Sequence, residues 1–93
     1  LPLSVLEAMS VGLPIVASNV IGNSDAIKHA ESGYLYNLGD IGCAVRYIEE
    51  ILNDKNLYDS FSINSYKRQR QLFSHEKMSK AYLDLYLKIS GRF

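Results

Sequence analysis

The feature that most limits the fold of this chain is a change of texture near residue 40. Before it, short helical and short apolar segments alternate, punctuated by glycine and proline at Gly12, Pro14, Gly22, Gly33 and Gly39. After it, proline is absent and apolar residues recur with helical spacing. Strands that alternate with helices favour a parallel sheet with right-handed crossovers. The sequence therefore predicts an α/β fold, with a βα region over residues 1–40 and a helical part over residues 41–93.

The first forty residues predict two helices and two short strands. Pro2 suits the first turn of a helix over residues 3–11, which Gly12 can end in a left-handed conformation. The apolar run 13–17 contains β-branched residues and is typical of a strand covered on both faces of a parallel sheet. The remaining expected elements are a polar loop at 18–24, a helix at about 24–30 capped by Asn23 or Ser24, and a strand at 34–36.

Three helices are expected after the second strand. Asp40 can cap the first, whose apolar residues fall three and four apart at Ile41, Ala44, Val45, Ile48, Ile51 and Leu52. The second runs from about residue 56 to 72 and is less regular. Ser74 can cap the third, whose stripe is Met78, Ala81, Tyr82, Leu85 and Ile89.

Composition excludes several classes of protein. Ten basic residues balance ten acidic ones, so no overall field favours nucleic acid as a partner. The single cysteine, Cys43, rules out an internal disulfide, fits a reducing compartment and is expected to be a small core residue. His29 and His75 lack metal-ligand spacing, so we assign no metal site. No apolar run approaches the ~20 residues that a membrane span needs.

Glu7 is the side chain with the clearest chemical potential. The helix at 3–11 is apolar on nearly all sides, which predicts burial, and Ser4 and Glu7 share one stripe near its start. Unpaired N–H groups and a partial positive charge at a helix start favour phosphate. A carboxylate one turn further can accept hydrogen bonds from two sugar hydroxyls. The alternative is that Glu7 faces water and only complements the helix dipole.

Other polar and aromatic groups favour structural roles. The loop 18–25 follows the end of an expected strand, where α/β sheets bind ligands, but its small polar residues also suit a turn. The basic residues Lys67, Arg68, Arg70, Lys77 and Lys80 indicate a solvated surface, or contact with an anionic membrane. The seven tyrosines, including Tyr82 and Tyr86, are expected to pack the final helices.

The segment from Leu3 to Ser18 closely resembles the carboxyl-terminal domain of family 4 glycosyltransferases. These enzymes have the GT-B architecture, in which two Rossmann-like domains face each other across a cleft. Their signature is a glutamate, seven intervening residues, and a second glutamate followed by Ala-Met and Gly-x-Pro-Val-Val-Ala. Glu7, Gly12 and Pro14 match the second glutamate and the glycine and proline positions. The first glutamate would lie two residues upstream of Leu1.

The resemblance continues along the chain in the same order. Gly22-Asn23-Ser24-Asp25 is similar to the family's Gly-x-Pro-Glu segment, with Ile21 where a second glycine is common. Gly33-Tyr34-Leu35-Tyr36 and Gly39-Asp40 resemble its Gly-Leu-Leu-Val…Gly-Asp. Phe73-Ser74-His75-Glu76 resembles its Phe-Ser-Trp-Glu, with His75 in place of tryptophan.

The resemblance implies a Rossmann-like half of a retaining enzyme that moves a sugar from a nucleotide diphosphate donor to a sugar or lipid-linked acceptor. Glu7 would bind the ribose, and Leu3 and Ser4 would offer main-chain N–H groups to the sugar and diphosphate. No cofactor is implied. We expect residues 1–93 to be a partial nucleotide-sugar-binding domain, because the chain starts with Leu1 rather than methionine and the first glutamate falls outside it. The piece alone should be inactive, and the enzyme cytoplasmic or peripheral to the inner face of the membrane.

Two further expectations stay open at this point. A noncatalytic α/β binding or interaction module could use the same fold, because fold does not determine function. A two-stranded parallel sheet is also incomplete, since such strands need further strands and helices to cover them. The isolated chain should therefore be marginally stable or self-associate.

Overall fold

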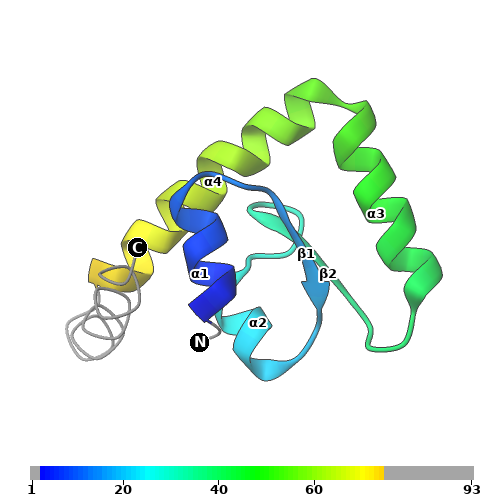
Figure 1. The fold of residues 1–93 in the computed structure, drawn as a ribbon, viewed down its shortest axis with the longest axis horizontal. Coiled ribbons are helices and arrows are strands. Elements are labelled where there is room, and N and C mark those ends of the chain that lie inside the picture. Colours follow the sequence, from blue (N-terminus) through cyan, green and yellow to red (C-terminus); the bar gives the residue numbers. More distant parts are fainter. Residues whose placement is uncertain (1–2, 75–93) are drawn as a thin grey trace.

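The computed structural model describes residues 3–74 and confirms an α/β fold. The elements follow in the order α1 (Leu3–Ser10), β1 (Ile15–Ser18), α2 (Ile21–Ala26), β2 (Gly33–Tyr36), α3 (Ile41–Asn53) and α4 (Lys55–Ser74). The strands are parallel and adjacent, in register from Ile15 opposite Gly33 to Ser18 opposite Tyr36. Figure 1 shows them between α1 and α3, with α4 crossing above. The third expected carboxyl-terminal helix lies outside the described residues.

Helix α1 ends as the sequence predicts. Gly12 adopts φ 74°, and the N–H groups of Gly12 and Leu13 donate to the carbonyls of Met9 and Ala8 at 3.0 and 3.1 Å. This pair of bonds satisfies the last carbonyls of the helix and turns the chain back into β1. Burial of the helix on nearly all sides is not observed, because only Leu6 and Met9 are fully buried. The apolar residues Leu3, Val5 and Ala8 of α1 are therefore only half-buried.

The core lies between α1, the strands and the end of α2. Leu6, Met9, Ala26 and Ile27 are buried together, with partly buried side chains packed around them at Val5, Ile15, Ala17, Leu35 and Leu72. The strands approach closely at Gly33, where a Cβ atom would clash with the carbonyl of Ile15 and lie 3.2 Å from a methyl carbon of Ile27. Glycine is therefore required there by space.

The helix between the strands differs from its prediction. It was expected at about 24–30, but α2 begins at Ile21 and ends at Ala26. Val20 precedes it in an extended conformation without a side-chain cap. Asn23 and Ser24 lie inside the helix, where they donate to the carbonyls of Ser18 and Ile21 at 2.9 and 3.0 Å instead of capping.

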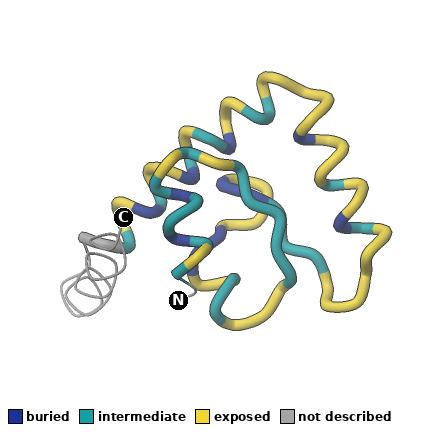
Figure 2. The backbone as a smooth tube through the Cα atoms, in the orientation of Figure 1, coloured by how far each residue is buried: buried dark blue, intermediate teal, exposed yellow. Residues whose placement is uncertain are grey.

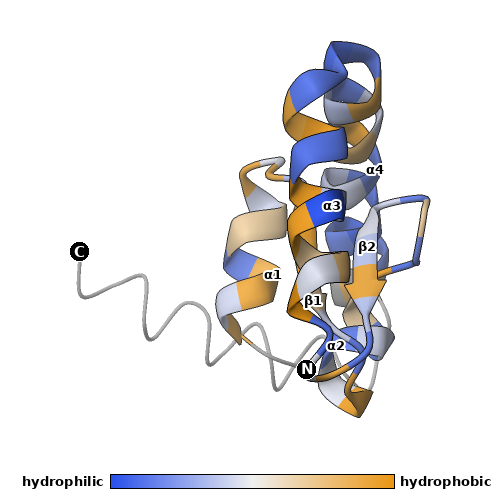
Figure 3. Ribbon diagram, turned by 90° about the vertical axis from the view of Figure 1, so that its right-hand side faces the viewer, coloured by the Kyte–Doolittle hydropathy of each residue, from blue (hydrophilic) through white to orange (hydrophobic). Residues whose placement is uncertain are grey.

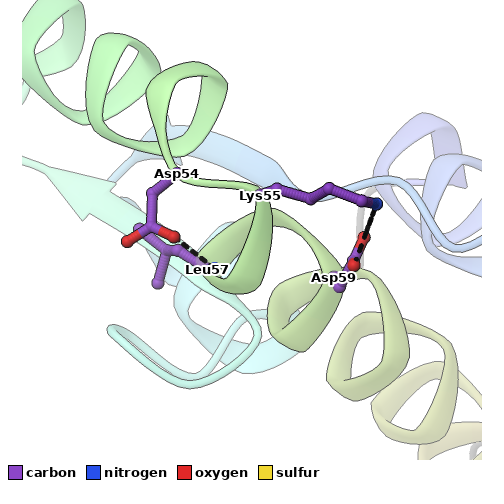
Figure 4. Close-up of polar contacts among 4 residues, drawn as sticks. All are labelled: Asp54, Lys55, Leu57 and Asp59. Carbon is purple, nitrogen blue, oxygen red and sulfur yellow. Dashed lines mark hydrogen bonds and ion pairs between the residues drawn. The ribbon is translucent and has the colours of Figure 1, made fainter.

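Side-chain caps mark the starts of α3 and α4. The Asp40 carboxylate accepts from the N–H of Cys43 at 3.1 Å, which confirms its predicted role. Asp54 accepts from the N–H of Leu57 in the same way, and Lys55 pairs with Asp59 at 3.1 Å on the exposed first turns of α4 (Figure 4). The break between the two helices is therefore sharp, and α4 continues as one helix of 20 residues.

An aromatic cluster joins β2 to the two long helices. Tyr34 stacks on Tyr47 of α3 with centroids 4.1 Å apart, and it meets Phe61 of α4 edge to face at 5.0 Å. His29 contacts both tyrosines, and its Nδ1 accepts from the N–H of Leu35 at 3.0 Å. Burial, and to a smaller extent the Glu50 carboxylate, raises the pKa of Tyr34. These tyrosines pack β2 against α3 and α4; Tyr82 and Tyr86 lie outside the described residues.

Much of the apolar face of α3 is uncovered within the described part of the chain. Ala44 and Ile51 are buried, as predicted for this stripe. Ile41, Val45, Ile48 and Leu52 share the stripe but are exposed. Figure 2 shows that buried and exposed residues alternate along this helix, and Figure 3 shows that hydrophobic and hydrophilic residues do so. Cys43, expected in the core, is only half-buried near the cap of α3.

The close approach at Gly33 gives a stability prediction. Gly33→Ala should destabilise the chain by about 1–3 kcal/mol, because the new methyl group must push β2 away from the Ile15 carbonyl. Gly42→Ala is the matched control: its Cβ would have no atom nearer than 3.5 Å, and alanine favours helix, so stability should rise by up to about 1 kcal/mol. Urea unfolding measures both, and equal effects would contradict the strand packing described.

Candidate functional site at the carboxyl edge of the sheet

The carboxyl ends of both strands meet at one edge of the sheet. β1 ends at Ser18 and β2 at Tyr36, and the N–H of Asn19 donates to the carbonyl of Tyr36 at 2.7 Å just beyond them. Helix α1 runs antiparallel to β1, because the short link after it reverses the chain, so α1 begins at this edge too (Figure 1). It contacts α2 there. The edge where α/β sheets bind ligands is thus formed from three separate segments.

Three helices start at this edge, with different caps. The Asp40 carboxylate accepts from one N–H group in the first turn of α3, that of Cys43. Val20 provides no side-chain cap for α2, and α2 is only one or two turns long. Helix α1 starts at Leu3 without an acidic residue in its first turn. Because a helix start carries unpaired N–H groups and partial positive charge, the beginning of α1 favours an anion.

The three residues predicted for the donor site lie together on α1. Leu3 and Ser4 are in its first turn, where N–H groups have no partner within the helix. Glu7 follows one turn later and is half-buried. Within residues 3–72, no donor hydrogen-bonds the Glu7 carboxylate, although the Glu7 carbonyl accepts from Ser10 at 2.6 Å. The carboxylate is therefore available to a ligand at this edge.

Asn23 has a positional role that the sequence did not reveal. Its side-chain amide donates to the carbonyl of Ser18, the last residue of β1, across the turn into α2. The sequence suggested a helix cap or a ligand contact for this loop. Instead, Asn23 fixes the turn that brings α2 beside the start of α1. The signal that could have identified it is an amide side chain in the first turn of a short helix that closely follows a strand.

Three hollows of the structure lie away from Glu7. One apolar hollow is lined by the start of β1 together with α3, and another by the end of α1 together with α4. A polar one lies beside the start of β2. None of these three hollows is lined by Leu3, Ser4 or Glu7.

Metal ligands and membrane spans were also sought among the described residues. No group of three or more His, Cys, Asp or Glu side chains there could hold a metal ion. None of the helices in residues 3–74 has the length and apolar character to cross a membrane.

A family comparison decides what the chain is related to. The sequence model of the family "Glycosyl transferases group 1" matches residues 1–68, from the start of the chain into α4. The chain belongs to the group 1 glycosyltransferases. Membership supports sugar transfer in general, and it makes the noncatalytic interaction module a poorer account of this fold.

Individual relatives of this chain are named for different reactions or products. A capsular polysaccharide biosynthesis glycosyltransferase of Staphylococcus aureus is 30% identical over 76% of the chain, and an Escherichia coli UDP-Gal:α-D-GlcNAc-diphosphoundecaprenol α-1,3-galactosyltransferase is 39% identical over 61%. The N-acetyl-α-D-glucosaminyl L-malate synthase of Bacillus anthracis is 28% identical over 94%. The chain spans only 19%, 15% and 23% of the lengths of these three proteins.

The hydrogen bond from Asn23 gives a prediction about the stability of this edge. Asn23→Asp keeps the shape of the side chain but removes the donor, so it should cost about 0.5–1.5 kcal/mol of stability, the net contribution of one hydrogen bond. The Ser18 carbonyl still accepts from the N–H of Val20 at 2.9 Å. Asn37→Asp makes the same charge change at the same edge without breaking a side-chain bond, and should stay within about 0.5 kcal/mol. Thermal unfolding compares the stabilities of the two variants with that of the wild type. An Asn23→Asp variant as stable as the wild type would contradict the role assigned to this amide.

Proposed function

We propose that the chain forms part of the donor site of a retaining glycosyltransferase that uses a nucleotide diphosphate sugar. The transferred sugar would go to a sugar or lipid-linked acceptor. In this proposal Glu7 accepts hydrogen bonds from the two ribose hydroxyls, and the N–H groups of Leu3 and Ser4 bind the sugar or diphosphate. The observation that carries it is the position of these residues: a helix start at the carboxyl edge of the sheet, with an unpaired carboxylate one turn further in.

The chemistry suits this arrangement. A nucleotide diphosphate sugar offers an anion and a pair of vicinal hydroxyls at fixed separation. A helix start binds the first, and a carboxylate can accept from both hydroxyls of the second. Sugar transfer makes the diphosphate leave with its bonding electrons, so positive charge placed around it lowers the barrier. The residues described here supply the partial charge of α1 and no covalent nucleophile.

A single wall is not a complete active site. The relatives named above are several times longer than the chain, which covers 19%, 15% and 23% of their lengths. We infer that the opposing wall, the acceptor site and the first glutamate of the signature come from other parts of a longer polypeptide. The chain of 93 residues alone would then be inactive. Contact with a membrane surface remains part of this proposal.

The role of Glu7 predicts a loss of donor affinity. In the full-length polypeptide, Glu7→Gln keeps the size of the side chain but weakens two charge-assisted hydrogen bonds. Such bonds are each worth roughly 1.5–3 kcal/mol, so the affinity for the nucleoside diphosphate should fall about tenfold or more. Glu7→Ala should be worse, because both acceptor atoms are gone. Calorimetric titration with uridine diphosphate and then guanosine diphosphate measures the effect.

The matched control is Glu49→Gln, which removes the same charge from an exposed position on α3. It should leave the affinity unchanged. Melting curves must show that all variants fold alike. Equal affinities of wild type and Glu7→Gln would return Glu7 to a structural role at the start of α1.

The exposed stripe of α3 predicts self-association of the 93-residue chain. Ile41, Val45, Ile48 and Leu52 are between 45% and 70% exposed, and burying them in a second copy would release free energy. Sedimentation over a concentration series should show an average mass that rises with concentration. Ile48→Lys with Leu52→Lys should suppress the rise, whereas Ile63→Lys, exposed on α4, should not. A wild-type chain that stays monomeric and unfolds cooperatively would contradict this.

A further inference from the structure

A polar hollow lies between α4 and the loop that joins α2 to β2. It has a volume of about 290 Å³ and is lined by Lys28, Glu31, Ser32, Asn64, Lys67, Arg68 and Gln71. We call it the loop–α4 hollow. Because Ser32 directly precedes β2, the hollow lies beside the amino end of that strand, away from the carboxyl edge where Glu7 lies. The donor site proposed above does not use any of its residues.

Positive charge is concentrated in the loop–α4 hollow. The whole chain has as many acidic as basic residues. Here three cationic side chains, Lys28, Lys67 and Arg68, face one carboxylate, that of Glu31. The only ion pair among residues 3–72 is Lys55 with Asp59, so neither lysine ammonium is neutralised within that part of the chain. Like charges held together raise the energy of the free protein, and a bound anion would relieve that cost.

Backbone contacts hold the hollow in shape. The Arg68 guanidinium donates to the carbonyls of Asp25 and Ala26 at 3.0 and 3.3 Å, at the end of α2. Asn64 donates to the carbonyl of Glu31 at 2.9 Å. These bonds tie one face of α4 to both ends of the loop. The hollow is therefore preorganised, which lowers the conformational entropy that the protein loses when a ligand binds.

The free donors match a phosphate group. Two carbonyls occupy part of the Arg68 fork, which leaves the rest of its five N–H donors. Lys28 and Lys67 add ammonium groups, and cationic donors bind phosphate oxygens strongly. A phosphate monoester carries a charge of about −1.5 to −2 at neutral pH, close to the excess positive charge of the lining. The Oδ1 atom of Asn64 remains an acceptor for a hydroxyl on the organic part.

Arg68 also has a purely structural explanation. A cation that bonds the last carbonyls of a helix is favourable without any ligand. Lys28 and Lys67 are not held in this way: each is exposed and makes no side-chain hydrogen bond within residues 3–72, so both ammonium groups are open to water or to a ligand. We propose that the loop–α4 hollow binds the phosphate group of a small soluble phosphate ester, with Lys28 and Lys67 as the charge-bearing ligands and Arg68 as a fixed third donor.

The test uses the full-length polypeptide with inorganic phosphate as the probe. Uridine or guanosine diphosphate is present throughout at a concentration that fills the carboxyl edge but stays far below the millimolar range expected for a phosphate group at the hollow, so that phosphate is not counted at the carboxyl edge. Calorimetry at constant ionic strength should show saturable binding with a dissociation constant on the order of millimolar. The double variant Lys28→Gln, Lys67→Gln should bind about tenfold or more weakly, while Lys55→Gln, which removes a lysine charge elsewhere, should change affinity less than about twofold.

Three outcomes would overturn the proposal. One is phosphate binding that never saturates, and another is an equal loss in Lys55→Gln, which would indicate general screening. The third is binding of the wild type to phosphatidylglycerol vesicles without binding of inorganic phosphate, which would assign these lysines to a membrane surface. Affinity for the nucleoside diphosphate should be the same in the double variant and the wild type. Failure here therefore stays separate from failure of the donor-site proposal, which Glu7→Gln tests.

Discussion

Parallel pairing of two four-residue strands is the constraint on which the rest of this structure depends. Parallel strands cannot be joined by a tight hairpin, so the chain must cross over between them. The crossover contains α2 and the loop before β2, and it returns the chain to the amino edge. Both strands then end at the same edge, where α1, α2 and α3 all begin. The pairing thus decides that helix starts gather on one side of the sheet. It also requires Gly33, because the backbones meet too closely there for a side chain.

Helix α4 stabilises this small sheet from outside. Phe61 packs against Tyr34 of β2, and Asn64 and Arg68 bond to backbone carbonyls on either side of the crossover loop. A two-stranded sheet is marginal in water, so a long helix that contacts α1, α2 and α3 adds the cover that its strands lack. The same contacts define the loop–α4 hollow. The structure that supports the sheet and the structure that holds the cationic side chains are therefore the same.

The sequence predicted those features that depend on neighbours in the chain. The turn at Gly12 and the cap at Asp40 were expected and are present, since each needs only a few consecutive residues with the right side chains. The start of α2 was placed too late, because the prediction relied on a side-chain cap at Asn23 or Ser24, and α2 begins after Val20 without one. The bonds of Arg68 join residues more than forty positions apart, so no local pattern could reveal them. The third expected carboxyl-terminal helix, with Met78 in its stripe, falls on residues outside those described.

In the candidate site, too, the features that depend on nearby residues were predictable and those that depend on distant residues were not. The placement of Leu3, Ser4 and Glu7 at a helix start followed from local spacing and from the family signature, and the structure puts that helix start at the carboxyl edge. None of the three hollows described above includes Glu7, and the apolar stripe of α3 is exposed. Both features fit the proposal above, in which residues outside 3–74 complete the donor site and cover the apolar stripe. An edge able to bind a charged ligand from one side only gains little, because water competes for every N–H group and for the Glu7 carboxylate. Excluding that water requires a second wall, so the chemistry of this edge depends on what closes over it.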